Sequence, residues 1–314
     1  MSTPRVRVIL NPRAAAGAAI KKVGDIEAAL QRYELSHQIV LTRSRGHASE
    51  LARAAAADGV EVIAVVGGDG TLNEVIQAYV NAAGEPVAGP DVALIPCGTG
   101  GDFKRTLGMS GALDEAVARI RHGTRRAVDL GLALLTAHAG GDVVQGFMNV
   151  VGVGLGGQVD AIVNESHGAM KWLGGRASFF LGTLRAMSMY RNASVRVRVD
   201  GVVFYEGPVV NVAIANGRFF GAGMMIAPHA DPSDGRFEVV ALGDLTKAEV
   251  IGLTPKIYKG AHLAVEGVKV TSGSRVEVEA VHPWATVLID VDGEQPGKLP
   301  LRATLAKGAL MFRV

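Results

Sequence analysis

The segment Val60–Val66 constrains the fold more than any other part of the sequence. Its residues are mostly apolar, and many are β-branched, which is typical of a strand buried on both faces of a parallel sheet. The segment runs directly into Gly67-Gly68-Asp69-Gly70-Thr71, where glycines let the backbone approach a ligand closely. A helix is expected to follow from Leu72 to Asn81. A buried strand, a glycine-rich turn and a helix in this order predict an α/β fold.

The first 131 residues alternate between strand-like and helix-like segments, which predicts a doubly wound parallel sheet with helices on both faces. Strand-like segments dominate afterwards, and Asp200-Gly201 is a strong two-residue hairpin signal. The expected strands are 6–10, 37–42, 60–66, 92–95, 143–151, 195–199, 202–206, 208–215, 236–242, 268–271, 275–281 and 286–291. The expected helices are 18–32, 47–57, 72–81, 112–121, 169–190 and 246–258.

This pattern predicts an α/β plus β architecture with two domains. The first domain covers residues 1–131, and residues 301–314 are expected to return to it. Residues 132–300 are expected to form a mainly antiparallel β-sandwich. The active site is expected in the cleft between the two domains.

Composition excludes several classes of protein. A formal net charge of +2 over 314 residues gives no support to a nucleic-acid partner. Cys97 is the single cysteine, so the chain has no internal disulfide, as expected in a reducing compartment. The first ten residues do not resemble a signal peptide, and no apolar stretch approaches the roughly 20 residues of a membrane-spanning helix. We therefore expect a cytoplasmic protein that meets a membrane only at its surface.

Three loops are expected at the carboxyl edge of the parallel sheet. Besides Gly67–Thr71, these are the loop from Asn11-Pro12-Arg13 to Gly17 and the turn Gly98-Thr99-Gly100-Gly101-Asp102. Consecutive backbone amides at the start of a helix bind anions. The carboxylates of Asp69 and Asp102 suit a magnesium ion or a proton taken from a nucleophile. The simpler alternative is a tight strand-to-helix turn with Thr71 as the N-cap.

The sequence resembles the diacylglycerol kinase catalytic-domain family, the soluble bacterial lipid kinases related to sphingosine and ceramide kinases and, more distantly, to NAD kinases. The resemblance covers essentially the whole chain. The motifs that carry it are Asn11-Pro12 with Gly17, Gly67–Glu74, Gly98-Thr99 with Asp102-Phe103, Val128–Gly131, Asn149 with Gly152-Val153-Gly154, Ala215-Asn216-Gly217 with Gly221 and Gly223, Pro228 with Ser233-Asp234-Gly235, and Asp292-Gly293-Glu294.

The resemblance implies an ATP-dependent lipid kinase that uses Mg²⁺. It places Glu294 as the general base for the substrate hydroxyl, and Asp69 as a magnesium ligand or as the base itself. It also implies a structural magnesium ion held by the Asp234 side chain and the main-chain carbonyls of Asp231 and Arg236. The implied nucleotide-binding residues are Asn11, Pro12, Arg13, Thr42, Gly67, Gly68, Asp69, Gly70, Thr71, Leu72, Asn73, Gly98, Thr99 and Asp102. Gly101 departs from the family pattern, in which asparagine usually precedes the aspartate.

Other interpretations remain at this point. Asp292-Gly293 also suits a plain hairpin turn. Gly152–Gly157 matches a dinucleotide fingerprint, but the acidic residue expected about 20 residues later is absent. An NAD kinase would share the Gly67–Thr71 turn, and a non-catalytic nucleotide-binding or membrane-binding regulator could keep the fold.

The basic, aromatic segment 169–191 suits either a membrane surface or a helix packed on the second domain. The expected partners are a lipid substrate presented at a membrane and a second copy of the chain in a homodimer.

Overall fold

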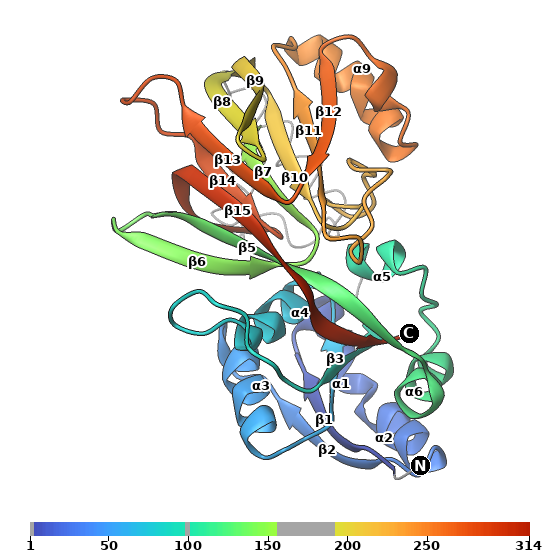
Figure 1. Cartoon of the computed structure of the whole chain (residues 1–314). Helices are drawn as coiled ribbons and strands as arrows, with labels where there is room; N and C mark the ends of the chain where they lie inside the picture. The colour runs from blue at the N-terminus through green and yellow to red at the C-terminus, as the bar shows by residue number, and fades with distance from the viewer. Residues whose placement is uncertain (1–2, 98–100, 156–191) are drawn as a thin grey trace. The chain divides into compact units, whose positions relative to one another are not determined.

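The computed structural model describes residues 3–97, 101–155 and 192–314 (Figure 1). The chain divides into two compact units, one formed by Met1–Leu130 with Ala306–Val314 and the other by Gly131–Leu305. Each unit has its own hydrophobic core.

The first unit is built on a sheet in the order β15-β4-β3-β1-β2, in which the paired strands run parallel. Its central strands contain almost only buried apolar side chains, because helices cover both faces. The strands are β1 (Arg5–Leu10), β2 (Ser36–Leu41), β3 (Val62–Gly67), β4 (Asp91–Pro96) and the end of β15 (Glu294–Arg313).

Helices lie on both sides of this sheet (Figure 1). Buried residues of α2 and α6 share one core cluster with alternate residues of β1, β3 and β4. The helices α3 and α4 pack against each other on the opposite side. The bounds are α1 (Ala18–Lys21), α2 (Val23–Arg32), α3 (His47–Ala57), α4 (Asp69–Ile76), α5 (Asp102–Thr106) and α6 (Leu113–His122), with 3-10 turns η1 (Ala14–Gly17) and η2 (Gln77–Tyr79). The predicted doubly wound architecture is confirmed.

The second unit is a β-sandwich-like domain with antiparallel pairing, which confirms the predicted class. One series of paired strands runs β12-β11-β10-β7-β14-β15, and β13, β8 and β9 continue from β15. The bounds are β5 (Arg125–Ala137), β6 (Asp142–Phe147), β7 (Val150–Gly154), β8 (Ala193–Val199), β9 (Val202–Val209), β10 (Asn211–Ala215), β11 (Phe237–Leu242), β12 (Val268–Gly273), β13 (Arg275–Ala280) and β14 (Leu288–Val291).

Valine-rich faces of these strands meet in the core of the second unit. Alternate residues such as Val151, Val153 and Val212 pack with Val195, Val197 and others in one cluster. The opposite face of β10 and β11 is covered by the helix α9 (Lys247–Tyr258), which is followed by the 3-10 turn η4 (His262–Ala264).

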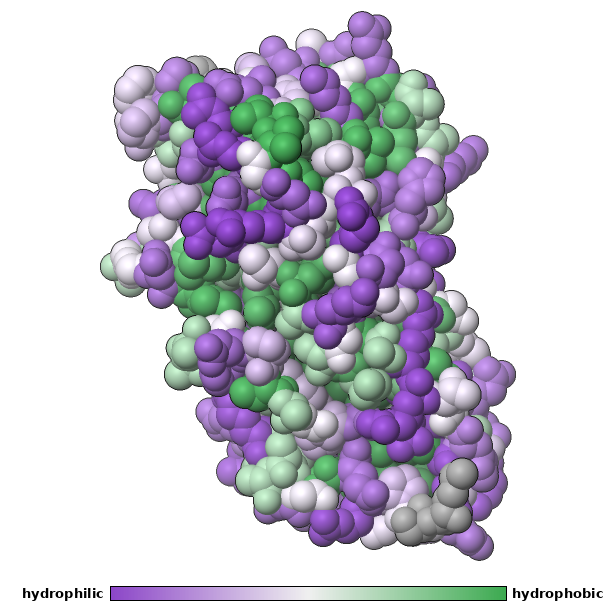
Figure 2. All heavy atoms as spheres, in the orientation of Figure 1, coloured by the Kyte–Doolittle hydropathy of each residue, from purple (hydrophilic) through white to green (hydrophobic). Residues whose placement is uncertain are grey.

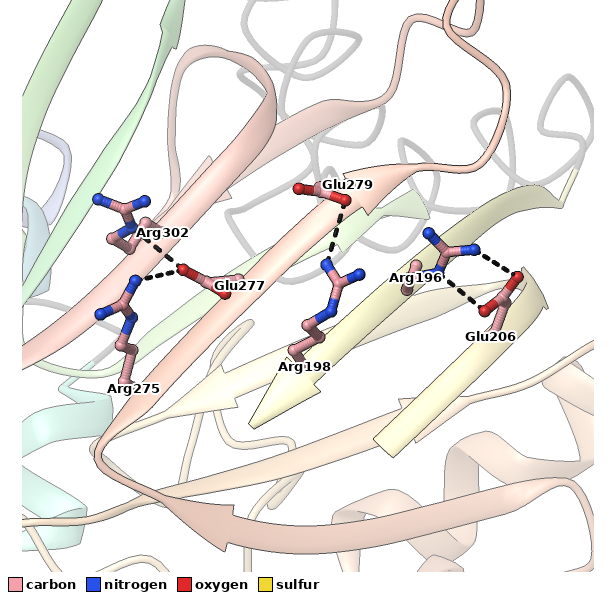
Figure 3. A network of polar contacts seen from close by, with 7 residues as sticks. All are labelled: Arg196, Arg198, Glu206, Arg275, Glu277, Glu279 and Arg302. Atoms are coloured by element: carbon pink, nitrogen blue, oxygen red, sulfur yellow. Dashed lines mark hydrogen bonds and ion pairs between the residues drawn. The ribbon is translucent and has the colours of Figure 1, made fainter. Parts of the chain in front are cut away.

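The outward face of β8, β9, β13 and β15 carries paired charges instead (Figure 3). Arg196 bonds Glu206 at 2.8 and 3.0 Å, and Arg198 contacts Glu279 at 3.3 Å. Glu277 lies between Arg275, at 2.5 Å, and Arg302, at 3.3 Å. Strands that alternate between valine and charged residues thus separate a core face from a solvent face.

Several predicted elements differ from the structure. The helix expected at 72–81 begins at Asp69, and its N-cap is Gly68 rather than Thr71. The strand expected at 143–151 is two strands, because the chain turns at Met148 and Asn149. The expected helix 18–32 is interrupted at Lys22, and the long strands β5 and β15 were not predicted.

The predicted helix 169–190 lies outside the described residues. Within the described part of the chain, none of the helices combines the length and apolar character needed to span a membrane.

Candidate active site

The loops that follow β1, β2 and β3 surround a cavity of about 190 Å³. Because these strands are parallel, three loops that are far apart in sequence reach the same edge of the sheet. The cavity is lined by Asn11, Pro12, Arg13, Thr42, Arg43, Ser44, Arg45, Thr71 and Glu74.

Hydrogen bonds fix the three loops to one another. The backbone N–H of Asn11 donates to the carbonyl of Val66 at 3.1 Å, and that of Thr42 donates to Leu10 at 2.9 Å. The Asn11 side-chain Nδ2 donates to Thr71 Oγ1 at 3.2 Å. The loop after β1 is therefore tied to the strand and helix of the central turn.

The turn between β3 and α4 requires glycine. A Cβ atom added to Gly67 would lie 2.5 Å from Thr71 Oγ1, so the first turn of α4 packs directly on the strand end. The first N–H groups of a helix have no acceptor within the helix, and they attract anions. This end of α4 therefore suits a phosphate group.

The charge of the cavity also suits an anion. Its lining contains three arginines, Arg13, Arg43 and Arg45, and one acidic residue, Glu74. A carboxylate oxygen of Glu74 accepts the backbone N–H of Ala48 at 3.3 Å, so this acid is engaged by the start of α3. Guanidinium groups bind phosphate oxygens with charge-assisted hydrogen bonds.

Asp69 lies at the start of α4, but its carboxylate points to the next loop. It accepts the backbone N–H groups of Gly101 at 2.7 Å, Asp102 at 2.9 Å and Phe103 at 3.2 Å. These are the N-terminal groups of α5, which a carboxylate stabilises as a cap. Asp69 therefore joins two successive strand-end loops of the sheet.

Asp102 is buried and forms an ion pair with Arg105, one helical turn away, at 2.5 Å. Gly101 precedes it with a φ of 88°, a left-handed conformation that glycine adopts readily. Asparagine adopts this conformation more readily than most other residues, so glycine keeps the backbone shape here and removes only the polar side chain of the family pattern. Gly98 and Thr99, which belong to the same predicted loop, lie outside the described residues.

Glu294 lies in the second unit, directly after a tight turn between β14 and β15. The turn residues Asp292 and Gly293 have φ values of 51° and 87°, as in a type I′ hairpin. The Asp292 carboxylate accepts the N–H groups of Met148, Asn149 and Val150 at 2.8, 2.9 and 2.9 Å. The position of the Glu294 backbone is therefore fixed by a network anchored in β7.

The proposed magnesium ligands form a second turn in the same unit. The Asp231 carbonyl accepts the N–H of Asp234 at 3.3 Å, and the Asp234 carboxylate accepts the N–H of Arg236 at 2.8 Å. Asp234 is exposed. Among the described residues no cluster of three or more histidine, cysteine or acidic side chains could hold a metal. One carboxylate with carbonyls and water nevertheless fits Mg²⁺, which keeps much of its hydration shell in proteins.

The structure gathers part of the predicted nucleotide-binding set. The cavity is lined by Asn11, Pro12, Arg13, Thr42 and Thr71. The remaining described members lie at the end of β3, in the N-terminal half of α4 and at the start of α5, and Leu72 and Asn73 are buried. Arg43, Ser44, Arg45 and Glu74 also line the cavity but are not in the predicted nucleotide-binding set, although Glu74 ends the motif Gly67–Glu74. Arg43, Ser44 and Arg45 directly follow Thr42, in the loop after the second strand, and this position is the only clue to their role in the sequence.

Two family models together match nearly the whole chain. Residues 5–133 match the diacylglycerol kinase catalytic domain. Residues 150–313 match the YegS C-terminal NAD kinase beta sandwich-like domain.

Relatives align over almost their full length. A diacylglycerol kinase of Mycobacterium tuberculosis (strain ATCC 25618 / H37Rv) is 28% identical, covering 98% of this chain and 94% of the relative. A "Probable lipid kinase YegS-like" protein of Xanthomonas euvesicatoria pv. vesicatoria (strain 85-10) is 30% identical, with 94% and 91% covered.

A crystal structure from Bacillus anthracis str. Sterne aligns with a TM-score of 0.78 at 25% identity, covering 100% of this chain and 96% of the other. The fold, both domain matches and the full-length relatives agree. The chain belongs to the family of diacylglycerol kinases and YegS-like lipid kinases, phosphotransferases whose acceptor is an alcohol group.

Proposed function

We propose that this chain transfers the γ-phosphoryl group of ATP to the hydroxyl group of a diacylglycerol-like, sphingoid or ceramide-like lipid. The observation that carries the proposal is the cavity at the ends of β1, β2 and β3, which three arginines line together with Thr71 and Glu74 of α4. This donor set fits a polyphosphate, because it combines guanidinium groups with the first N–H groups of a helix.

Phosphoryl transfer requires mainly positioning and stabilisation of charge. In the proposed site, Arg13, Arg43 and Arg45 attract and orient the phosphate chain. Mg²⁺, when bound with ATP, neutralises charge on the phosphate oxygens. Asp231, Asp234 and Arg236 are proposed to hold a separate structural Mg²⁺ in the second unit.

We assign different tasks to the two catalytic candidates. The Asp69 carboxylate accepts three N–H groups at the start of α5. We therefore assign Asp69 the role of positioning the loop that leads into α5. Glu294 is held at the end of an anchored hairpin turn, which suits a general base that takes the proton of the lipid hydroxyl. The lipid is proposed to be reached by peripheral contact with the cytoplasmic face of a membrane.

The test is an assay with labelled ATP and Mg²⁺ against diacylglycerol, monoacylglycerol, sphingosine, ceramide and NAD. We expect label in a lipid product. Glu294→Gln should lower kcat by about 100-fold or more while the Kd of ATP stays unchanged. Asp69→Asn should weaken ATP binding and also lower kcat, because the loop at α5 loses its anchor.

Matched variants distinguish the cavity from general surface charge. Arg43→Gln and Arg45→Gln should each raise the Kd of ATP, whereas Arg53→Gln, on the exposed side of α3, should not. Label in NAD alone would identify an NAD kinase. Full activity of both Glu294→Gln and Asp69→Asn would show that the site lies elsewhere.

A further inference from the structure

The helix α9 exposes an apolar stripe on the side that faces away from its own core. Ala248, Ile251, Pro255 and Tyr258 are all exposed, and they recur at intervals of three and four residues, so they lie on one face of the helix. Ile251 is 55% exposed and Tyr258 is 48% exposed. Figure 2 shows hydrophobic residues at the surface at the upper right, in the region where Figure 1 draws α9 and β12.

The opposite face of α9 already packs on the domain. Val250, Leu253 and Ile257 are buried in a cluster with residues of β10 and β11. A surface helix normally keeps its remaining faces polar. The apolar stripe of α9 is therefore additional to what the fold of this unit requires.

Basic side chains accompany the stripe. Lys247, Lys256 and Lys259 lie in the helix or directly after it, and all are exposed. The single acidic residue of the helix is Glu249, whose carboxylate accepts the backbone N–H and the hydroxyl of Thr246 at 2.7 Å each. This capping box directs the only negative charge of the helix to its N-terminus.

The flanking segments carry two further acids and one further lysine. Asp244 accepts a hydrogen bond from Asn192 at 2.7 Å, and Glu266 is exposed beyond η4. Lys269 lies over the ring of Tyr205 at 5.5 Å. The charge that accompanies the stripe along the helix is therefore positive.

We propose that the outward face of α9 is a docking surface for an anionic phospholipid bilayer. Apolar side chains between lysines suit the boundary between acyl chains and negatively charged headgroups. Tyr258 brings an aromatic ring with a polar end, a combination that favours the membrane interface. This inference rests on the proposed function, since a lipid kinase must reach a substrate held in a membrane.

The position of α9 within the fold supports a stable docking element. Its N-terminus is fixed by the capping box at Thr246, and its C-terminal end is tied by the N–H of Met225, which donates to the carbonyl of Ile257 at 3.2 Å. A helix held at both ends presents its side chains without a large ordering cost on binding. The bilayer would meet a surface that is already formed.

The test is flotation of the full-length protein with vesicles of phosphatidylcholine, with and without phosphatidylglycerol. Ile251→Ser combined with Tyr258→Ser should reduce binding to the anionic vesicles by about tenfold or more. Lys256→Glu combined with Lys259→Glu should remove the preference for phosphatidylglycerol. The matched control is Val202→Ser with Val203→Ser, which removes apolar side chains that are 71% and 50% exposed at the tip of the β8–β9 hairpin.

A second measurement separates docking from catalysis. The α9 variants should keep the thermal stability of the wild type and its activity on a monomeric short-chain diacylglycerol, but lose activity on long-chain diacylglycerol in vesicles. If the wild type phosphorylates none of the lipids, the proposed function is refuted. Flotation measures binding without turnover, so it would still test whether α9 contacts the bilayer.

Three outcomes would overturn the docking surface. Unchanged flotation of the Ile251→Ser, Tyr258→Ser variant would place membrane contact elsewhere. A large loss of stability would show that the chain itself covers the stripe. Loss of a dimer without loss of vesicle binding would assign the stripe to a second copy of the chain.

Discussion

At the scale of single residues, the carboxylate of Asp69 connects the glycine-rich turn after β3 to the loop that leads into α5. The three N–H groups it accepts all belong to the start of α5, so the side chain acts as a cap for a helix that follows 33 residues later. Asp69→Asn replaces one of the two acceptor oxygens by an NH2 group and removes the negative charge at the start of α5. It should therefore lower Tm in the absence of any ligand, and loss of the charge alone should lower the free energy of unfolding by about 0.3–1 kcal/mol. A residue that served only as a metal ligand would not lower Tm when removed.

Calorimetry of the ligand-free protein checks this prediction. Asp25→Asn is the matched control, because Asp25 lies exposed in the first turn of α2 and the same charge is removed there. Equal melting temperatures for wild type and Asp69→Asn would show that the cap contributes nothing to stability.

His262 gives the second unit a pH dependence. It is fully buried, its Nε2 lies 3.0 Å from the Ile226 carbonyl, and burial lowers its pKa below the ordinary value of 6.5. Because the unfolded chain binds this proton more readily, the contribution of neutral His262 is complete above about pH 6.5 and is lost as the pH falls further. His262→Gln keeps a donor for Ile226 but does not titrate.

The measurement is Tm between about pH 8 and pH 5.5. Below about pH 6.5 the Tm of the wild type should fall more steeply with decreasing pH than the Tm of His262→Gln. The titration of one histidine changes the free energy of unfolding by at most about 1.4 kcal/mol per pH unit. Parallel curves would show that His262 does not carry the pH dependence.

At the scale of elements, the charged face of β8, β9, β13 and β15 is a network rather than a set of isolated pairs. The hydrogen bond from Arg275 lowers the pKa of Glu277, and Arg302 adds to the effect. The stability that this carboxylate contributes is present above about pH 4.3 and is lost as the pH falls through its lowered pKa.

Glu277→Gln should therefore lower Tm at neutral pH, and the difference from wild type should shrink near pH 3 and in about 1 M salt. Glu266→Gln, which changes an exposed glutamate outside the network, is the control. A Tm difference that is independent of salt would point to a packing effect instead of ion pairing.

The elements that sequence alone predicts are those with a strong local pattern. The sequence pattern predicts the helix 47–57 at its observed bounds and the buried strand before Gly67 to within two residues, because periodicity and β-branched runs act locally. The start of α4 was not predicted, since its first residues include glycine, a poor helix former. Their helical conformation depends on packing against the strand end, which no local pattern reveals.

The candidate site likewise contains residues that a local sequence pattern reveals and residues that only the fold brings to it. The glycine-rich turn is visible in the sequence because its residue types are unusual. Arg43 and Arg45 look like ordinary surface arginines, and only the alignment of parallel strand ends brings them to the cavity. The contact between Asp69 and α5 was equally invisible, because it joins two loops through side-chain geometry.

At the scale of the whole molecule, the last nine residues belong to the first unit although they follow the second unit in sequence. Phe312 is fully buried there, pairs with Val92 of β4, and its ring lies 5.3 Å from that of Phe103. Asp129 accepts the N–H of Gly308 at 2.7 Å, and Asp91 forms an ion pair with Arg313 at 2.9 Å. The first unit therefore cannot complete its core before residues 306–314 have been made.

Phe312→Ala should destabilise the first unit by about 3–5 kcal/mol, the usual cost of removing a buried phenylalanine side chain. ATP with Mg²⁺, which we propose to bind this unit, should offset part of the loss, by about 2.7 kcal/mol at 100 times its Kd. Phe237→Ala is the matched variant in the second unit, where Phe237 is fully buried and stacks on Phe147 at 5.5 Å.

Differential scanning calorimetry of both variants, with and without ATP and Mg²⁺, measures the two effects together. We expect ATP to raise the transition that Phe312→Ala has lowered, because ligand binding and the C-terminal strand stabilise the same unit. If the units unfold independently, ATP should leave the transition lowered by Phe237→Ala unchanged. If ATP does not raise the transition that Phe312→Ala has lowered, ATP does not bind to the unit that residues 306–314 complete.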